Sequence, residues 1–336
     1  MTEVINEMPP VENAGEGQKE LNPFFKALRT FCGWFGFGVF GATSNKRRRK
    51  VFYDVITYII LVFFAFIMIY PFWWMIAASF ARNRASMLDT VWWPSELATE
   101  NRGGTFFYHY TNIMRIMENN NFDYWRVVLN TLIYSIVPVV IGLITSTMAA
   151  FAFAKLNFKG KNFVFFYCLA AIMVPGPSIM IAQFCVYSEL NWTMNGLSMI
   201  IPGCFGAIMT AFFIRQFLFS MPTSIIEAAK IDGAGYWRIF WGFVMPLAMP
   251  AVMAQGILSF IGCWNNYLGP LIFVRSSEWY PLALVVSQLN TEIGTNVDSA
   301  PSVMALAVLA LLPVLVLFAV FQKTIIGSIM LTGSKE

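Results

Sequence analysis

Long apolar runs separated by shorter polar segments fill the chain from about residue 51 to its carboxyl end. Each run approaches the roughly 20 residues that an α-helix needs to cross the hydrocarbon core of a bilayer. The pattern predicts six spanning helices at Val55–Ala78, Val128–Ala154, Phe163–Val186, Leu197–Phe219, Leu247–Phe273 and Val303–Phe321. The expected fold class is therefore an all-α polytopic membrane protein with about six transmembrane helices.

Composition supports this fold class. Of the 336 residues, 58% are hydrophobic and 12% are charged. Soluble domains carry roughly 25% charged residues, so soluble globular classes are excluded. The five cysteines show no metal-ligand or disulfide spacing, and we expect no metal site. His109, the only histidine, falls in a loop after the first span. We interpret it as a lone surface residue without a role.

The basic residues predict the orientation in the membrane. If the amino terminus is inside, 16 of the 22 Lys and Arg residues fall on the inner side. Cytoplasmic segments are rich in Lys and Arg, so both termini are expected in the cytoplasm. The basic run Lys46-Arg47-Arg48-Arg49-Lys50 comes directly before the first span, where it is a topology anchor rather than a nucleic-acid site. Residues 1–50 are expected to form a partly disordered cytoplasmic extension, followed by a transmembrane domain over 51–336.

A polar segment at about residues 220–246 lies between the fourth and fifth predicted spans. Ser224 and Glu227 have the spacing of a capping box, which predicts the start of a short helix. Gly233 suits the left-handed turn at the end of that helix, because a Cβ would resist this conformation. A second helix is expected over Tyr236–Val244, running back toward the fifth span. The segment is therefore predicted to be a helical hairpin on the cytoplasmic side.

One face of the first helix carries Ile225, Ala228, Ala229 and Asp232 at helical spacing. The two alanines are small enough to let another backbone approach. A capping role alone would require neither the Ala pair nor the Asp-Gly that follows. We therefore expect a partner to dock on this hairpin.

These residues carry a resemblance to a known family. Glu227-Ala228-Ala229, followed by Asp232-Gly233-Ala234, Phe240, Pro246 and Pro250, resembles the "EAA" loop of ABC-importer permease subunits. Further matches to the family's pattern are Asn130-Thr131-Leu132, Ala152-Phe153-Ala154-Lys155-Leu156, Phe158-Lys159-Gly160, Phe212-Phe213-Ile214-Arg215-Gln216, Met221-Pro222, Trp264-Asn265-Asn266-Tyr267 and Pro270-Leu271. The likeness covers about residues 50–334. Within the family, the sequence is similar to the second membrane subunit of maltose-type transporters.

The resemblance implies a type I ABC-importer permease in the bacterial inner membrane, taking up a carbohydrate, with an oligosaccharide favoured. The hairpin would be a coupling helix that docks on a dimer of ABC ATPase subunits. The implied docking residues are Glu227, Ala228, Ala229, Asp232 and Gly233. A second permease subunit would complete a heterodimer, and an external solute-binding protein would touch residues 79–127 and 274–302.

ATP and Mg²⁺ are expected to be used by the separate ATPase subunit, so the chain itself is not expected to be an enzyme or to bind a cofactor. The sequence agrees, since it contains no G-x-x-x-x-G-K-[ST] phosphate-binding loop.

The solute path is predicted from residue chemistry. Sugar recognition uses amides for the hydroxyl groups and aromatic faces for the ring. Amides and aromatic rings in the third and fifth predicted spans supply both: Gln183, Gln255, Trp264, Asn265, Asn266 and Tyr267. The alternative is that the amides simply join neighbouring helices. Pro175-Gly176-Pro177 would kink or break the third span, either as a passive bend or as the wall of a wet cavity.

Other functions remain open at this point. The first is an ABC importer for another small polar solute. The second is a secondary carrier, which the near absence of acids and bases in the spans disfavours, because such carriers use intramembrane ionisable groups. The third is a membrane scaffold without a transport path.

Overall fold

The computed structural model describes residues 45–97, 107–292 and 300–333. Of the predicted amino-terminal extension, residues 1–44 lie outside the described residues. Two units make up the chain, Met1–Ile67 and Met68–Glu336. The described part of the first unit is the beginning of helix α2, which starts at Asn45 and ends at Ala78 in the second unit.

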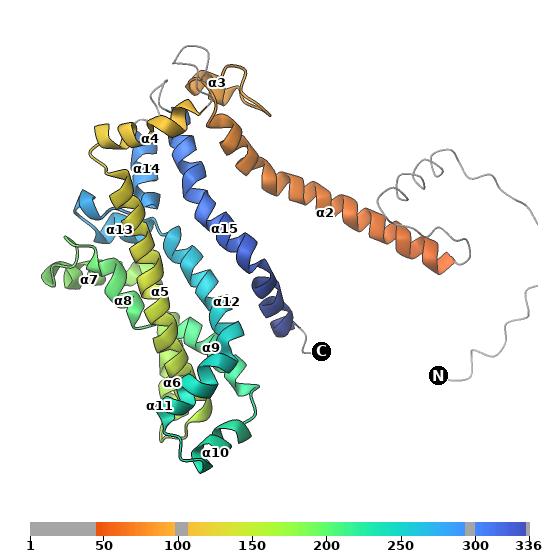
Figure 1. Cartoon of the computed structure of the whole chain (residues 1–336), viewed down its shortest axis with the longest axis vertical. Coiled ribbons are helices and arrows are strands. Elements are labelled where there is room, and N and C mark those ends of the chain that lie inside the picture. The colour runs from red at the N-terminus through yellow and green to blue at the C-terminus, as the bar shows by residue number, and fades with distance from the viewer. Residues whose placement is uncertain (1–44, 98–106, 293–299, 334–336) are drawn as a thin grey trace, which may run out of the picture. The chain divides into compact units, whose positions relative to one another are not determined.

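The remaining elements belong to the second unit (Figure 1). In chain order they are α3 (Arg84–Leu88), α4 (Tyr108–Asn119), α5 (Tyr124–Lys155), α6 (Lys161–Ile172), α7 (Gly176–Glu189), α8 (Leu197–Cys204), α9 (Ile208–Phe219), α10 (Ser224–Ile231), α11 (Tyr236–Ile239), the π-helical η2 (Phe240–Val244), α12 (Met245–Trp264), α13 (Leu268–Phe273), the 3₁₀-helical η3 (Ser277–Trp279), α14 (Leu282–Glu292) and α15 (Ala300–Gly333). Among the described residues, β pairing is limited to one bridge between Ala81 and Leu97. The predicted all-α class is confirmed.

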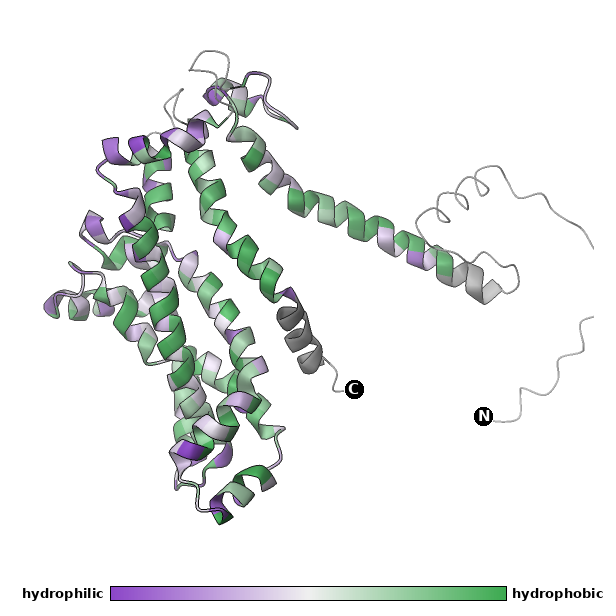
Figure 2. Cartoon of the chain, viewed as in Figure 1, coloured by the Kyte–Doolittle hydropathy of each residue, from purple (hydrophilic) through white to green (hydrophobic). Residues whose placement is uncertain are grey.

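Five helical segments are long and apolar enough to cross a membrane: Val51–Ala78, Tyr124–Lys155, Leu197–Phe219, Tyr236–Trp264 and Ala300–Gln322. A bent pair of shorter helices raises the number to six if it counts as one span. Figure 2 shows the apolar colour running along α5 and α15, with polar residues gathered toward α4. The predicted number of spans agrees with this architecture.

The third predicted span, Phe163–Val186, is not one straight helix. α6 ends at Ile172, α7 begins at Gly176, and the two are bent by 95°. Pro175 adopts an extended ψ of 129°, and Pro177 lies in the first turn of α7. Proline has no backbone N–H and restricts the residue before it, so the helix cannot continue through this segment.

The fifth predicted span, Leu247–Phe273, was placed too far toward the carboxyl end. The spanning helix begins at Tyr236, passes through η2 into α12, and ends at Trp264. The Oδ1 of Asn266 accepts a hydrogen bond from the Gly269 N–H at 3.0 Å, which satisfies a backbone donor at the start of α13. Asn265 and Asn266 therefore lie in a break between two helices rather than inside a span.

α5 is the central helix of the second unit and packs against α8, α9 and α12. Buried apolar residues near its carboxyl end form one core with α9, α10, η2 and α12. Near its amino end, a second core combines α4, α12, α14 and α15 around residues such as Val127 and Trp264. The hairpin predicted at 220–246 joins the first of these cores.

The fourth span contains a break between α8 and α9, and side chains of α5 bind the backbone there. Gly206, between α8 and α9, has a φ of +82°. Across the break, the Ala207 N–H donates to the Ser146 Oγ at 3.1 Å, and the Thr145 Oγ1 donates to the Cys204 carbonyl at 3.0 Å. Backbone groups freed inside a membrane require such partners. The two hydroxyls of α5 therefore stabilise the break.

His109 is buried, which corrects its prediction as a surface residue. Its side chain is 1% exposed, with Nδ1 2.7 Å from the Ser302 Oγ and Nε2 2.9 Å from the Ala81 carbonyl oxygen. Both partners are distant in sequence, so no local sequence pattern could predict these hydrogen bonds. The imidazole joins α4, the start of α15 and the segment after α2.

Candidate functional site

The 224–244 hairpin consists of α10, a tight turn, α11 and η2. The predicted capping box at its start is wrong. Thr223, not Ser224, is the N-cap residue, and no side chain caps the helix. Thr223 has φ −71° and ψ −23°, a helical conformation, whereas a capping side chain needs an extended backbone to reach the first free N–H groups. Glu227 lies in the first turn, where its negative charge interacts favourably with the positive end of the helix dipole.

The turn confirms the prediction for Gly233. This residue has a φ of +77°. The Ala234 N–H donates to the Ala229 carbonyl at 2.9 Å, and the Gly233 N–H donates to the Lys230 carbonyl at 3.0 Å. These two bonds form a Schellman motif, the helix ending that favours glycine in the left-handed position.

One side of α10 packs inside the chain. Ile226 and Ala229 are 4% and 3% exposed and belong to the core that contains Phe151 and Phe240. The rings of Phe151 and Phe240 lie 6.1 Å apart between centroids. Ala229 is thus used for packing within the chain. Of the implied docking residues, Glu227, Ala228, Asp232 and Gly233 remain exposed.

The opposite side of the hairpin exposes large apolar side chains. Ile231 is 86% exposed and Trp237 is 67% exposed. The Lys230 ammonium lies 5.0 Å from the centroid of the Tyr236 ring, which joins the two arms across the turn. Sequence reasoning missed Ile231 and Trp237. The sequence offered no signal for Ile231, because the buried side of α10 is set by the packing of Ile226 and Ala229 against other helices.

The base of the hairpin is anchored to the end of α5. The Lys155 Nζ donates to the Met221 carbonyl at 2.6 Å, just before α10. The Lys161 Nζ donates to the Leu156 carbonyl at 2.9 Å. The Arg215 Nε donates to the Phe153 carbonyl at 3.2 Å. Cationic side chains commonly satisfy the last carbonyls of a helix. Of these bonds, the one from Lys155 joins the segment just before α10 to the end of α5.

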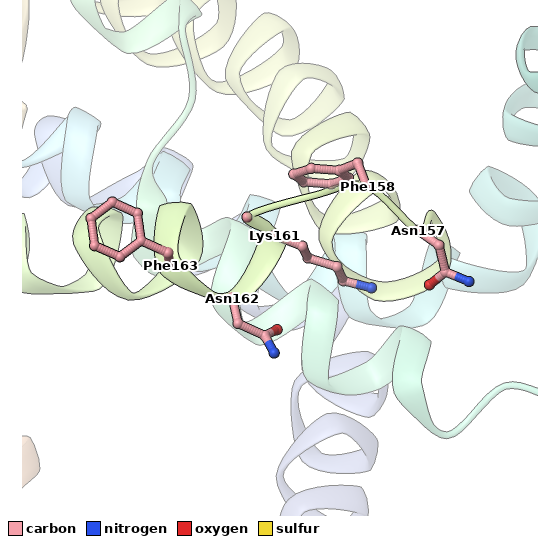
Figure 3. Close-up of a pocket in the computed structure, with 6 residues that line it drawn as sticks. Asn157, Phe158, Lys161, Asn162 and Phe163 are labelled. Atoms are coloured by element: carbon pink, nitrogen blue, oxygen red, sulfur yellow. The ribbon is translucent and has the colours of Figure 1, made fainter.

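The anchor borders a hollow at the turn between α5 and α6 (Figure 3). Its volume is about 310 Å³, and its lining residues are Asn157, Phe158, Gly160, Lys161, Asn162 and Phe163. In Figure 3 the Lys161 side chain extends toward Asn157, whereas Phe163 lies on the other side. The Arg215 guanidinium lies 3.8 Å from the centroid of the Phe165 ring. This arrangement braces α6 and α9 at the base of the hairpin.

The predicted solute-path residues have several different surroundings. Trp264 is 4% exposed, its Nε1 donates to the Ala310 carbonyl at 3.0 Å, and its ring stacks on Phe260. The indole therefore joins α12 to α15 and has no open face. Asn265 and Tyr267 are exposed beside it.

The amides in the spans are half-buried. Gln255 lies in α12, nine positions before Trp264, which is about 14 Å along a helix. Gln183 lies in α7, which packs against α13. The six residues therefore lie along α12, the break after it and α7, rather than in a single cluster.

Comparison with known proteins identifies the family. Residues 139–329 match the family model described as "Binding-protein-dependent transport system inner membrane component". The chain is 32% identical to an arabinooligosaccharides transport system permease protein, AraQ, of Halalkalibacterium halodurans, over 81% of this chain and 93% of that protein. The chain belongs to this family. It is thus a multi-pass transport permease of the bacterial inner membrane, and the resemblance seen in the sequence is confirmed.

Other relatives match most of the length of the permease. The diacetylchitobiose uptake system permease protein NgcG of Streptomyces coelicolor is 26% identical, over 86% of this chain and 90% of that protein. The lactose transport system permease protein LacG of Rhizobium radiobacter is 27% identical, over 84% and 95%. A crystal structure of a bacterial ABC transporter that imports the polysaccharide alginate contains a chain of the same fold, with a TM-score of 0.68 and 23% identity. It covers 84% of this permease and 99% of that chain.

Proposed function

We propose that this permease is a membrane-spanning subunit of an ATP-driven importer that takes up a carbohydrate, with an oligosaccharide as the favoured cargo. ATP would be bound and hydrolysed with Mg²⁺ by separate ATPase subunits. The sequence contains no phosphate-binding loop of its own, which supports this division of work.

The 224–244 hairpin is the observation that carries the proposal. Its inner side is held by buried packing and by the Lys155 bond to Met221, while its tip exposes Ile231 and Trp237. The exposed Ile231, in a polar segment beside the charged Glu227 and Asp232, supports a docking site at this tip. The ATPase dimer would dock here through Ile231, Glu227, Ala228 and Asp232, with Gly233 setting the turn.

The orientation follows from the distribution of Lys and Arg, which favours a cytoplasmic hairpin and cytoplasmic termini. Residues 1–50 would form the amino-terminal extension, and residues 51–336 the permease domain. A second permease subunit would complete the translocation path, and a solute-binding protein would deliver the cargo from outside. Closure of the ATPase dimer would then pull the hairpin and reorient the spans.

Carbohydrate is the cargo class that the relatives favour. Three relatives, one named for arabino-oligosaccharides, one for diacetylchitobiose and one for lactose, match over at least 81% of this chain. In this permease, the exposed Asn265 and Tyr267 would contact the sugar, with Asn266, Gln255 and Gln183 further along the path. Trp264 would support them from behind, since its indole is committed to Ala310.

A relative from Synechocystis keeps one alternative open. It is named an osmoprotective compounds uptake permease and is 27% identical over 87% of this chain. An importer for a small polar solute would use the same hairpin and ATPase. The two candidate functions differ only in the solute that crosses the membrane.

The test is uptake by proteoliposomes that contain the permease, its partner permease and the ATPase subunits, with the solute-binding protein added outside. Labelled arabinotriose, lactose and diacetylchitobiose are offered in turn, with glycine betaine as the small-solute comparison. ATP or a non-hydrolysable analogue is enclosed. We expect uptake of at least one sugar that requires both hydrolysable ATP and the binding protein.

Equal uptake with the analogue would contradict the proposal and indicate a secondary carrier. Uptake of glycine betaine with none of the sugars would replace the carbohydrate assignment with the small-solute alternative. Absence of all uptake from a correctly assembled complex would favour a scaffold.

A further inference from the structure

The hairpin end of α5 gathers positive charge. Lys155, Lys161 and Arg215 each donate to a backbone carbonyl at or near the last turn of this helix. Lys159 follows in the turn that leads to α6 and is exposed. We refer to these four residues as the basic cluster. Like charges that lie close together repel one another, so the basic cluster favours an anion beside it.

The described residues pair no acid with the basic cluster. Between residues 124 and 226 the sequence contains a single Asp or Glu, Glu189, which is the last residue of α7. Within the part of the chain that the structure describes, no ion pair joins the cluster to an acid, Glu227 and Asp232 of the hairpin included. The backbone carbonyls accept hydrogen bonds but carry no net charge. The positive charge of the cluster is therefore left for an anion from outside the chain.

The hollow at the turn between α5 and α6 adjoins the basic cluster and offers hydrogen-bond donors (Figure 3). Its volume of about 310 Å³ lies within the roughly 300–1,000 Å³ of ligand pockets. Lys161 of the cluster lines it together with Asn157 and Asn162. The Lys161 ammonium binds the carbonyls of Leu156 and Ala154 at 2.9 and 3.4 Å, which leaves one of its three N–H donors without a partner among the described residues. Amide and ammonium donors around one hollow suit the oxygens of a phosphate group.

An exposed aromatic face of α6 begins at the same hollow. Phe163, which lines the hollow, shares one side of the helix with Phe166 and Tyr167, because their spacing is i, i+3 and i+4. These three residues are 75%, 70% and 70% exposed. Phe165 points to another side, where it is 8% exposed and its ring lies against the Arg215 guanidinium. The aromatic face of α6 is therefore turned away from the helices that α6 packs against, α5 and α9.

The hollow lies at the depth of lipid headgroups. α5 is an apolar helix of 32 residues, about 48 Å long, whereas a hydrocarbon core is roughly 30 Å thick. Its end therefore reaches the polar interface, and the hollow begins just after it, at Asn157. α6 then belongs to the bent pair of helices that counts as one span, so its aromatic face extends from the interface toward the hydrocarbon. The donors and the aromatic face thus match the polar and apolar parts of one phospholipid.

We propose that this hollow binds the headgroup of an anionic phospholipid, such as phosphatidylglycerol, and that the acyl chains lie along the aromatic face of α6. The phosphate oxygens accept hydrogen bonds from Asn157, Lys161 and Asn162, and the rest of the basic cluster adds positive potential. A free phosphate ion has no part that covers the aromatic face, which favours a lipid. Bound lipid reduces the repulsion at the base of the hairpin and so stabilises the fold. The inference goes beyond the proposed function and depends on neither cargo nor ATPase.

Native mass spectrometry of the full chain in detergent tests the site. Phosphatidylglycerol or phosphatidylcholine with the same acyl chains is added, and the dissociation constant of the first bound lipid is measured. Asn162→Leu removes a donor that lines the hollow, and Lys159→Gln removes one positive charge from an exposed residue. We expect phosphatidylglycerol to bind about tenfold more tightly than phosphatidylcholine, and each variant to weaken phosphatidylglycerol binding about five- to tenfold. Equal affinity for the two lipids in the wild type would overturn the inference.

Arg238→Gln is the matched control. Arg238 is exposed in α11 of the hairpin and does not line the hollow, and the variant removes the same charge as Lys159→Gln. The dissociation constant of phosphatidylglycerol should stay within twofold of the wild-type value. An equal weakening in Arg238→Gln and Lys159→Gln would show that the lipid responds to net charge alone, and the inference would fail.

Thermal unfolding separates a lipid from a free anion. Phosphatidylglycerol should raise the unfolding midpoint of the wild type by mass action, and Asn162→Leu should lose most of this rise. Inorganic phosphate at equal ionic strength should raise the midpoint far less. An equal rise with inorganic phosphate would assign the hollow to a free anion and exclude the lipid.

Photo-crosslinking in membranes identifies what covers the aromatic face. Benzoylphenylalanine at Phe163, which is 75% exposed beside the hollow, should give a product with the mass of the permease plus one phospholipid. A product with another protein would assign this face to a partner subunit and overturn the inference. None of these measurements involves a solute or ATP, so each outcome leaves the proposed importer untouched. Conversely, absence of ATP-dependent uptake would overturn the proposed function and leave the lipid site intact.

Discussion

At the scale of single residues, the tip of the hairpin depends on one backbone conformation. Gly233 has a φ of +77°, and a Cβ there would meet no atom within 4 Å. Space is therefore not the constraint, and the requirement for glycine comes from the left-handed conformation alone. This turn was predictable from the sequence because helix endings use local chemistry. The side of α10 that packs was not, because it depends on Phe151 and Phe240 in other helices.

Gly233→Val should uncouple ATP hydrolysis from transport. A side chain in this conformation costs about 1–2 kcal/mol, which lowers the ratio of native to non-native turn roughly 5- to 30-fold. We expect ATP-dependent uptake to fall, by at most about that factor, while the amount of inserted protein is unchanged. Gly235→Val is the control, since Gly235 has an extended conformation with φ −71° and also has open space around it. Normal uptake by Gly233→Val, or an equal loss in Gly235→Val, would refute the role of the turn.

At the scale of elements, α5 organises the second unit through polar bonds as well as apolar packing. Its hydroxyls hold the break between α8 and α9, and its buried amide and hydroxyls hold the segment 277–282. In a membrane, apolar burial drives helix association weakly, so such bonds and close backbone contacts have more influence. The approach of Gly142 to Gly203, where a Cβ at Gly142 would lie 2.5 Å from the Gly203 carbonyl oxygen, is one such contact.

Gly206→Ala should destabilise the contact between α5 and the break that separates α8 from α9. The loss of stability should exceed the cost of placing a side chain in the left-handed conformation. A Cβ there would lie 2.5 Å from the Ser146 Oγ, which cannot move without losing the Ala207 N–H. Overpacking of this kind costs about 1–3 kcal/mol. Gly160→Ala is the control, because Gly160 has the same φ of +82° and a Cβ added there would meet no atom within 4 Å. Thermal unfolding in one detergent should give Gly206→Ala the lower midpoint, and equal midpoints would contradict the close packing at Gly206.

The apolar runs predicted the elements better than their ends. Span positions followed from length and hydropathy, which are local properties. The bend of 95° between α6 and α7 did not follow from Pro175 alone, because a proline marks a break without setting its angle. The early end of α12 at Trp264 depends on the Asn266 bond to Gly269 and on the Trp264 bond to α15.

At the scale of the whole molecule, the hardest features to predict were contacts between distant segments. His109 meets Ser302 across 193 positions, and Trp264 meets Ala310 on another helix. The same limit applied to the candidate site. Glu227, Asp232 and Gly233 carried a recognisable pattern, whereas the exposure of Ile231 becomes visible only when Ile226 and Ala229 are seen to fill the core.

The central claim is that the hairpin tip docks the ATPase subunits, and their dissociation constant from the permease in nanodiscs tests it most directly. Ile231→Ala removes an apolar side chain that is 86% exposed in the free chain. If a partner covers it, the loss is about 1–2 kcal/mol, and the dissociation constant should rise roughly tenfold with thermal stability unchanged. Ile226→Ala is the paired control, since this buried residue should instead lower the stability of the permease by about 2–5 kcal/mol. An unchanged dissociation constant for Ile231→Ala would contradict the claim.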